Sequence, residues 1–253
     1  MLSKFSILIF VFYILSFIYA SANGIGKNIL SYKASIDKYY FSFNYKKLES
    51  LKLELSNEPA HNNDDKFLTN YYQGIINYCL GRIYYNYDKD KANKRFEEAL
   101  DNFLICDNIK TDVEITAMIS ATYGKLSSLS ILKVFVYGLK AKDYIEKAYK
   151  MNPYAPKVLI IAATHLMHIP EFYGGDKSKA RELLNNILSY KESKDSVRID
   201  WANYAEAFAY LAQLEILESN ISKAKVYMQK ALDRIPDYGF VKYDLAKQIK
   251  AKE

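Results

Sequence analysis

Two histidines and a glutamate lie close together in the sequence and could bind a metal ion. His165 and His168 are three residues apart, and Glu171 follows after three more. On one helix these residues would share a face. A metal site, however, needs ligands that converge from several directions and a supporting shell of hydrogen bonds. The chain has no second histidine pair and its third histidine, His61, is remote. Packing or capping is therefore the favoured role, and no metal is predicted.

The run Gly174-Gly175-Asp176 precedes a helical pattern and could bind an anion at a helix N-terminus. A phosphate-binding loop carries more glycine and a Lys-Ser/Thr pair, and both are missing here. The favoured interpretation is a turn whose glycines adopt positive φ, with Asp176 as the N-cap of the next helix.

Nucleophilic chemistry has little support in the sequence. The chain contains no G-x-S-x-G, H-E-x-x-H or C-x-x-C motif. Its two cysteines, Cys79 and Cys106, fall on neighbouring expected helices, so a disulfide and two free buried thiols both remain open. The sequence predicts a protein that is not an enzyme and has no cofactor.

The element that organises the chain is the 34-residue stretch Ala205–Tyr238. Small residues, Ala212 and Ala224, fall where two antiparallel helices would approach closely, and Ala231 faces the next unit. Pro236 ends the second helix. Period and positions resemble a tetratricopeptide (TPR) repeat, a helix–turn–helix unit that buries its apolar face only by stacking on neighbours.

Related patterns run through most of the chain. The run Leu80-Gly81-Arg82-Ile83-Tyr84 resembles the L-G-x-x-Y of the repeat, and further units span Thr111–Pro153 and Pro156–Tyr190. About five extra residues around Leu129–Gly138 predict a longer first helix in the former unit, and Ile169–Gly175 is an insertion in the latter. The resemblance implies an all-α, right-handed solenoid of about five helix pairs. Residues 23–63 form an N-terminal capping pair and linker, and residues 64–253 form the repeats with a C-terminal capping helix, Phe240–Lys250.

The resemblance also implies a binding surface. In TPR proteins certain positions of each first helix face an inner groove, and TPR arrays bind protein segments there. In this chain those positions hold Tyr78, Arg82, Tyr85, Lys125, Leu159, Leu166, Gln213 and Ile216. We expect a non-catalytic scaffold that binds a protein or peptide, through basic and aromatic residues in the N-terminal half and apolar residues in the C-terminal half.

A second resemblance implies an alternative. The pattern P…GGD..KA over Pro170–Ala180 is similar to the T-component of TRAP transporters, a periplasmic TPR protein that associates with a solute-binding protein. That resemblance implies a small apolar ligand, which would contact Leu159, Leu166 and Ile216.

The first 22 residues resemble a targeting signal. Lys4 is the only charged residue among them, Phe5–Tyr19 is apolar apart from serine, and Ala20-Ser21-Ala22 is a cleavage motif. We expect a periplasmic or secreted protein with no stable membrane span after cleavage, with retention of the segment as an anchor as the alternative. The net charge is +6, but the charges are interspersed, so nucleic acid is not predicted as a partner.

Overall fold

The computed structural model describes residues 32–189 and 201–253, and these residues form helices packed in adjacent pairs. The all-α class is confirmed, and no strand occurs in the described ranges. Residues 32–41 form the first described helix. The others are α2 (Tyr45–Ser56), α3 (Asn63–Tyr84), α4 (Lys89–Ile109), α5 (Val113–Leu129), α6 (Val134–Met151), α7 (Pro156–His168), η1 (Glu171–Tyr173), α8 (Lys177–Ser189), α9 (Trp201–Leu217), α10 (Ile221–Arg234), η4 (Phe240–Leu245) and α11 (Ala246–Lys250).

Small residues set how closely the paired helices approach. Ala212 on α9 and Ala224 on α10 are completely buried, as their positions in the 34-residue pattern predicted. Gly81 on α3 has the same role against α4, because a Cβ there would lie only 2.7 Å from Cε1 of Phe96. Close approach brings large side chains such as Phe96 into full contact with the facing helix, and Phe96 is completely buried.

Side-chain caps begin several helices. The Oδ1 of Asn44 accepts a hydrogen bond from the Lys47 amide at 3.2 Å, and the Oδ1 of Asp176 accepts one from the Lys179 amide at 2.8 Å. The cap at Asp176 was predicted from the sequence and is confirmed. Gly174 has a φ of 94°, and a Cβ on Gly175 would collide with the carbonyl oxygen of Ile169. The Gly-Gly-Asp run is therefore a turn that needs glycine.

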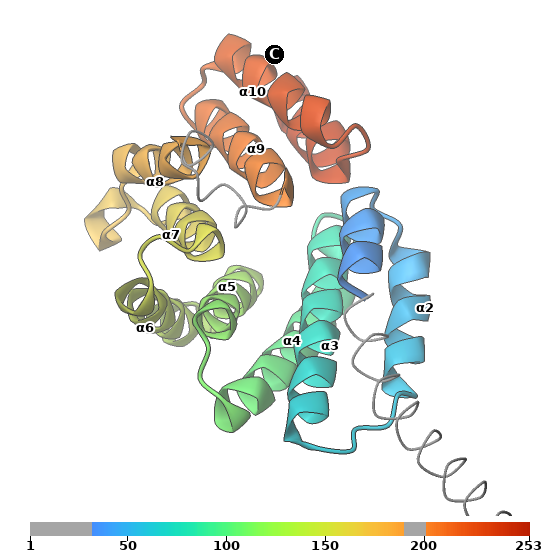
Figure 1. Cartoon of the computed structure of the whole chain (residues 1–253). Coiled ribbons are helices and arrows are strands. Elements are labelled where there is room, and N and C mark those ends of the chain that lie inside the picture. Colours follow the sequence, from blue (N-terminus) through green and yellow to red (C-terminus); the bar gives the residue numbers. More distant parts are fainter. Residues whose placement is uncertain (1–31, 190–200) are drawn as a thin grey trace, which may run out of the picture.

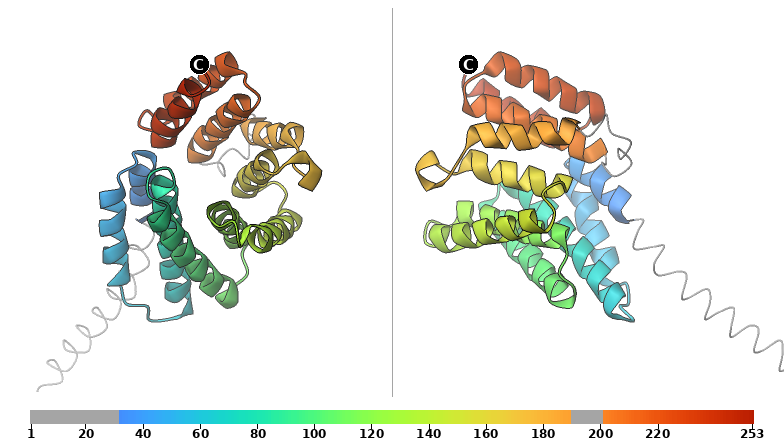
Figure 2. Two further views of the ribbon diagram at one scale, coloured as in Figure 1. Left: turned by 180° about the vertical axis from the view of Figure 1, so that it is seen from behind. Right: turned by 60° about the vertical axis from the view of Figure 1, so that its left-hand side comes forward.

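The helix pairs follow one another around a curve, and the two ends of the array meet (Figure 1). Helices α5, α7 and α9 lie on the inner side, and α6, α8 and α10 lie on the outer side; Figure 2 shows the same arrangement from two other directions. At the junction the ring of Phe41 packs edge-on against Tyr238 with centroids 4.8 Å apart. The guanidinium of Arg82 lies over three rings that come from the first helix, α9 and η4, namely those of Tyr40, Tyr210 and Phe240, at 5.1–5.6 Å.

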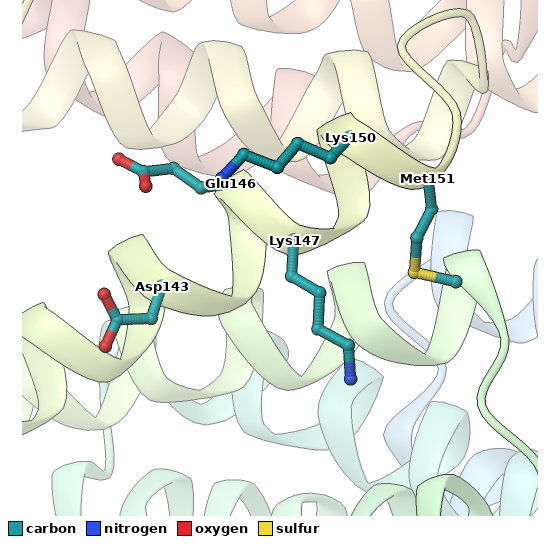
Figure 3. A pocket seen from close by; sticks show the side chains of 5 residues that line it. All are labelled: Asp143, Glu146, Lys147, Lys150 and Met151. Carbon is teal, nitrogen blue, oxygen red and sulfur yellow. The ribbon is translucent and has the colours of Figure 1, made fainter.

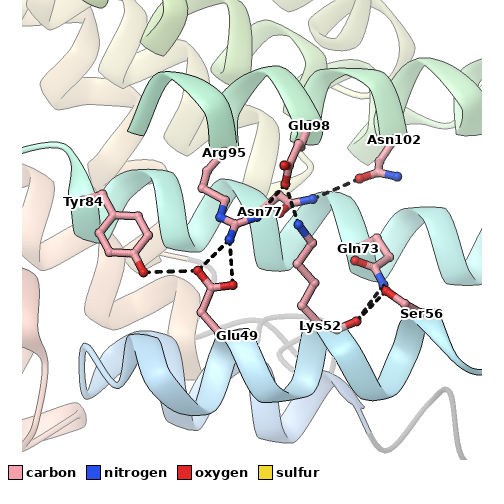
Figure 4. A network of polar contacts seen from close by, with 9 residues as sticks. All are labelled: Glu49, Lys52, Ser56, Gln73, Asn77, Tyr84, Arg95, Glu98 and Asn102. Atoms are coloured by element: carbon pink, nitrogen blue, oxygen red, sulfur yellow. Dashed lines mark hydrogen bonds and ion pairs between the residues drawn. The ribbon is translucent and has the colours of Figure 1, made fainter. Parts of the chain in front are cut away.

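Polar contacts fasten the N-terminal pair to the helices that follow it (Figure 4). Arg95 on α4 donates two hydrogen bonds of 2.8 Å to the carboxylate of Glu49 on α2 and one of 2.7 Å to Glu98. The hydroxyl of Tyr84 on α3 also donates to Glu49, at 3.1 Å. Bidentate pairing of a half-buried arginine fixes the angle between the helices as well as their contact.

The structure also corrects the sequence analysis. The first helix of the third pair does not lengthen, because α5 ends at Leu129. The extra residues instead form a turn and the exposed start of α6. Cys79 and Cys106 are buried free thiols. The predicted signal, residues 1–22, and the beginning of the capping pair lie outside the described residues. None of the described helices has the length and apolar character needed to cross a bilayer.

Candidate functional site

Seven of the eight predicted binding residues lie on the helices α3, α5, α7 and α9, and Tyr85 directly follows α3. Six are partly exposed: Tyr78, Arg82, Tyr85, Lys125, Leu166 and Gln213. Leu159 and Ile216 are each 1% exposed and belong to the core. The burial of Leu159 and Ile216 therefore does not support the expected contact with a ligand, since an apolar ligand could reach these side chains only if the core opened.

Tyr85 brings two ammonium groups together. The Nζ of Lys89 lies 3.5 Å from the centroid of its ring, and the Nζ of Lys125, on α5, lies 5.2 Å from it. The tyrosine hydroxyl donates a 2.9 Å hydrogen bond to Oγ of Ser128, one turn beyond Lys125 on the same helix. Tyr85, at the C-terminal end of α3, thus contacts α5 and has one cation from α4 and one from α5 near its ring.

Lys125 is held in an unfavourable environment for its charge. Burial, together with the positive charges of Arg82 and Lys89, lowers its pKa to about 7, whereas Asp244 opposes the shift. In the part of the chain that the structure describes, no carboxylate lies within 4 Å of its ammonium group. A positive charge with like-charged neighbours and no direct partner costs free energy of folding, which a bound anion would recover.

Polar groups from α7, α9 and η4 complete the surroundings. His168 on α7 has a pKa lowered to about 4 by burial and by the charge of Lys125, against the effect of a hydrogen bond with Gln213. Asp244 on η4 has a pKa raised by burial, against the effects of a hydrogen bond with Asn86 and the charges of Arg82 and Lys125. Near neutral pH His168 is therefore an uncharged donor and acceptor.

We define the inner cluster as Arg82, Tyr85, Lys125, His168, Gln213 and Asp244. Four of these residues were predicted from repeat positions, and they do lie together, since Lys125 is adjacent to Tyr85 and senses the charges of Arg82 and Asp244. His168 was weighed as a metal ligand and assigned to packing or capping. Asp244 was missed because nothing in the local sequence shows that the C-terminal segment returns to the inner side. Tyr78 packs on Phe96, with centroids 5.6 Å apart, and Leu166 packs against the core.

The inner cluster is suited to binding. Its members are enclosed by protein from several helices and still keep part of their surface in solvent, which is what a concave surface produces. It offers two cations, an imidazole and an amide, opposed by one carboxylate. Within the described ranges no three or more His, Cys, Asp or Glu side chains converge as a metal site would require.

Two depressions on the surface are weaker candidates for a binding site than the inner cluster. One has a volume of about 390 Å³ on the outer helix α6 and is lined by Asp143, Glu146, Lys147, Lys150 and Met151. Figure 3 shows that these side chains extend from a single helix in different directions. Another, of about 430 Å³, lies between the start of α4 and the turn after α5, where lysines alternate with Asp90 and Glu97. The lining of each depression mixes acidic and basic side chains and contains neither histidine nor cysteine.

Comparisons with known proteins identify no relative that would assign a role to the inner cluster. No model of a protein family matches the chain, and no curated protein sequence matches it either. The interpretation of the inner cluster therefore depends on its residues, their charges and their contacts.

Proposed function

We propose that the chain is an exported, non-catalytic scaffold of TPR-like repeats that binds a carboxylate-bearing segment of a protein partner at the inner cluster. The observation that carries the proposal is the convergence of Arg82, Tyr85 and Lys125 from α3 and α5. An aromatic ring flanked by cations is well suited to an extended peptide, because aromatic and arginine side chains are the commonest anchors of interfaces.

The charge at Lys125 supports a carboxylate as the group that is bound. The one carboxylate whose charge favours the ammonium form of Lys125 among the described residues is Asp244, and burial disfavours the charge of Asp244 itself. A carboxylate from a partner would remove the repulsion among the cations. Residues that cost stability in the free protein are common at binding sites, where they act only once the ligand is present.

We also propose that the helix pairs are TPR-like units. The 34-residue pattern at Ala205–Tyr238, with Ala212, Ala224 and Ala231 buried between helices, supports TPR-like units stacked as a right-handed solenoid. The apolar start of the chain with Ala20-Ser21-Ala22 supports export to the periplasm or beyond. The alternative of a TRAP-type component with an apolar ligand gains nothing from the burial of Leu159 and Ile216.

A selection from a displayed peptide library tests the proposal. We expect the immobilised protein to enrich peptides that contain Asp or Glu, and Tyr85→Ala to weaken the binding of those peptides by about 30-fold, the equivalent of roughly 2 kcal/mol for a lost anchor. The affinities are measured by calorimetry with the synthesised peptides.

Tyr154→Ala is the matched control, because Tyr154 is an exposed tyrosine in the turn between α6 and α7, away from the inner cluster. It should leave the affinity unchanged, and both variants should keep the helicity of the parent. Failure to enrich any peptide, or equal binding by Tyr85→Ala and the parent protein, would refute the proposal.

A further inference from the structure

Arg82 lies where the two ends of the array meet, and aromatic rings surround its guanidinium. The ring centroids of Tyr40, Tyr210 and Phe240 lie 5.6 Å, 5.6 Å and 5.1 Å from its Cζ. These rings come from the first helix, α9 and η4, and Figure 1 shows α9 and the first helix near the C-terminal end of α3. An aromatic face attracts the cation, but it offers no strong acceptor to the five N–H groups of the guanidinium.

The guanidinium has no acidic partner at contact distance. In the ranges that the structure describes, no carboxylate lies within 4 Å of Arg82. Glu206, a carboxylate that also acts on Tyr210, is already paired with Lys157 at 3.3 Å, and Asp244 attracts the guanidinium only from a greater distance. A hydrogen bond with the hydroxyl of Tyr210 engages one of the five N–H groups. An enclosed charge of this kind is usually paired with an anion.

Two tyrosine hydroxyls near this charge also lack partners. Tyr40 and Tyr238 are 6% and 0% exposed, and neither hydroxyl forms a hydrogen bond with a described residue. Burial raises the pKa of both side chains, although the positive charge of Arg82 opposes the shift, so both hydroxyls keep their protons and can donate. Buried polar groups without partners are rare in folded proteins, and a bound water or ion is a common explanation for them.

Solvent reaches the guanidinium, so an anion can approach it. Arg82 is partly exposed, and none of its nitrogen atoms is among the enclosed, unpartnered side-chain atoms of the described chain. The junction itself is closed by the edge-on contact of Phe41 with Tyr238, since both side chains are buried. The approach to Arg82 is therefore from the inner side, where Lys125 also lies.

We propose that Arg82 and the hydroxyls of Tyr40 and Tyr238 bind an oxyanion at the junction of the two ends, and we define these three residues as the junction site. A guanidinium presents parallel N–H donors that match the oxygens of a carboxylate or phosphate, and the hydroxyls add donors from other directions. Because Tyr40 belongs to the first helix and Tyr238 follows α10, a bound anion would tie the first and last elements of the array to α3.

The junction site shares Arg82 with the inner cluster, but it does not require a protein partner. Its oxyanion has two sources: a carboxylate, as in the segment of the proposed function, or a free phosphate-type anion. The failure of the protein to bind any acidic peptide would refute the proposed function and leave the junction site untouched. The absence of small-anion binding would refute the junction site and leave the selection of peptides to be judged separately.

Thermal unfolding of the full chain in the presence of small anions tests the junction site. The probes are inorganic phosphate and acetate at about 5 mM, each compared with chloride at equal ionic strength so that screening is constant. We expect at least one probe to raise the unfolding temperature by about 3 °C or more, the effect of a ligand at roughly ten times its Kd on a chain of this size. A shift with phosphate alone identifies a phosphate-type anion, and a shift with acetate identifies a carboxylate.

Three variants assign the shift to the junction site. Arg82→Met should abolish the shift, and Tyr40→Phe, which keeps the ring beside Arg82 and removes only the hydroxyl, should reduce it at least twofold. Tyr154→Phe is the matched control in the exposed turn between α6 and α7, and it should keep the full shift. No shift with either probe, or an equal shift in the parent and Arg82→Met, would overturn the proposal. If Arg82→Met does not fold, an undiminished shift in Tyr40→Phe would overturn it.

Discussion

Lys125→Met is expected to make the protein more stable and at the same time to abolish its binding of acidic peptides. The substitution keeps the aliphatic stem beside Tyr85 and removes a charge that burial and the positive charges of Arg82 and Lys89 destabilise. We expect a gain of at least ~1 kcal/mol, or about 2–4 °C in unfolding temperature for a chain of this size. A residue with only a structural role would show the opposite sign, because its removal would destabilise the fold.

The gain in stability from Lys125→Met should shrink as the pH rises. The folded pKa of Lys125, about 7, lies below the usual lysine value of 10.5, so the unfolded chain binds more protons between these pH values. The destabilisation is complete below the folded pKa and disappears as pH rises toward 10.5. The charged and titratable groups that face Lys125 are Arg82, Lys89, His168 and Asp244.

Urea unfolding of the parent and of Lys125→Met at pH values from about 6 to 10 measures this difference. The two stabilities should converge as pH rises. Lys150→Met, on the outer side of α6, is the matched control and should change stability by less than ~0.5 kcal/mol at any pH. Destabilisation by Lys125→Met, or undiminished peptide binding, would contradict the account of the inner cluster.

Arg181→Met is expected to cause the largest loss of stability, about 3 kcal/mol or more. Arg181 on α8 forms an ion pair with the completely buried carboxylate of Glu215 on α9 and so joins two successive helix pairs. Lys223 and Asn220 also donate to Glu215, at 2.8 Å and 3.0 Å. Removal of the arginine leaves the buried carboxylate with the donors of Lys223 and Asn220 alone, and the partial loss of compensation for a buried charge costs more than the loss of a surface pair.

The ion pair between Arg181 and Glu215 also predicts how the stability changes in acid. Burial raises the pKa of Glu215, but hydrogen bonds from Lys223, Asn220 and Arg181 outweigh burial and lower the pKa below the usual glutamate value of 4.5. Its contribution to stability is therefore present above pH 4.5 and is lost as pH falls through the folded pKa. In Arg181→Met that contribution is already reduced, so the difference from the parent protein should narrow in acid.

Glu218→Gln provides the control for Arg181→Met. Glu218 is the other carboxylate that Arg181 contacts, and its side chain is partly exposed, so we expect a cost below ~1 kcal/mol. Urea unfolding at about pH 7 and pH 4 measures both variants. Equal effects of the two substitutions would show that Glu215 is not the carboxylate on which this joint depends.

Local features of the fold could be predicted because they depend on neighbours in sequence. Asp176 caps a helix, and Ala212 and Ala224 are buried between paired helices. Each of these features follows from the sequence pattern of one or two helices. The junction of the two ends, where Phe41 meets Tyr238, could not be predicted, because contacts across nearly the whole chain leave no periodic signal.

The candidate site was predictable to the same degree. A repeat position indicates which side of a helix faces inward, and from these positions Arg82, Tyr85 and Lys125 were predicted to share the inner groove. It does not indicate which inward positions a neighbouring helix covers, so Leu159 and Ile216 were expected in the groove although both are buried. Asp244 enters the inner cluster only because the C-terminal segment folds back there.

Labelling of lysine amines, followed by mass spectrometry, tests the central claim most directly. At about pH 7.5 an amine with a pKa near 7 is largely uncharged and should be methylated faster than ordinary exposed lysines such as Lys150. The account predicts that a saturating acidic peptide from the library slows the labelling of Lys125 at least tenfold and leaves that of Lys150 unchanged. Unchanged labelling of Lys125 while the peptide is bound would show that the inner cluster is not the binding site.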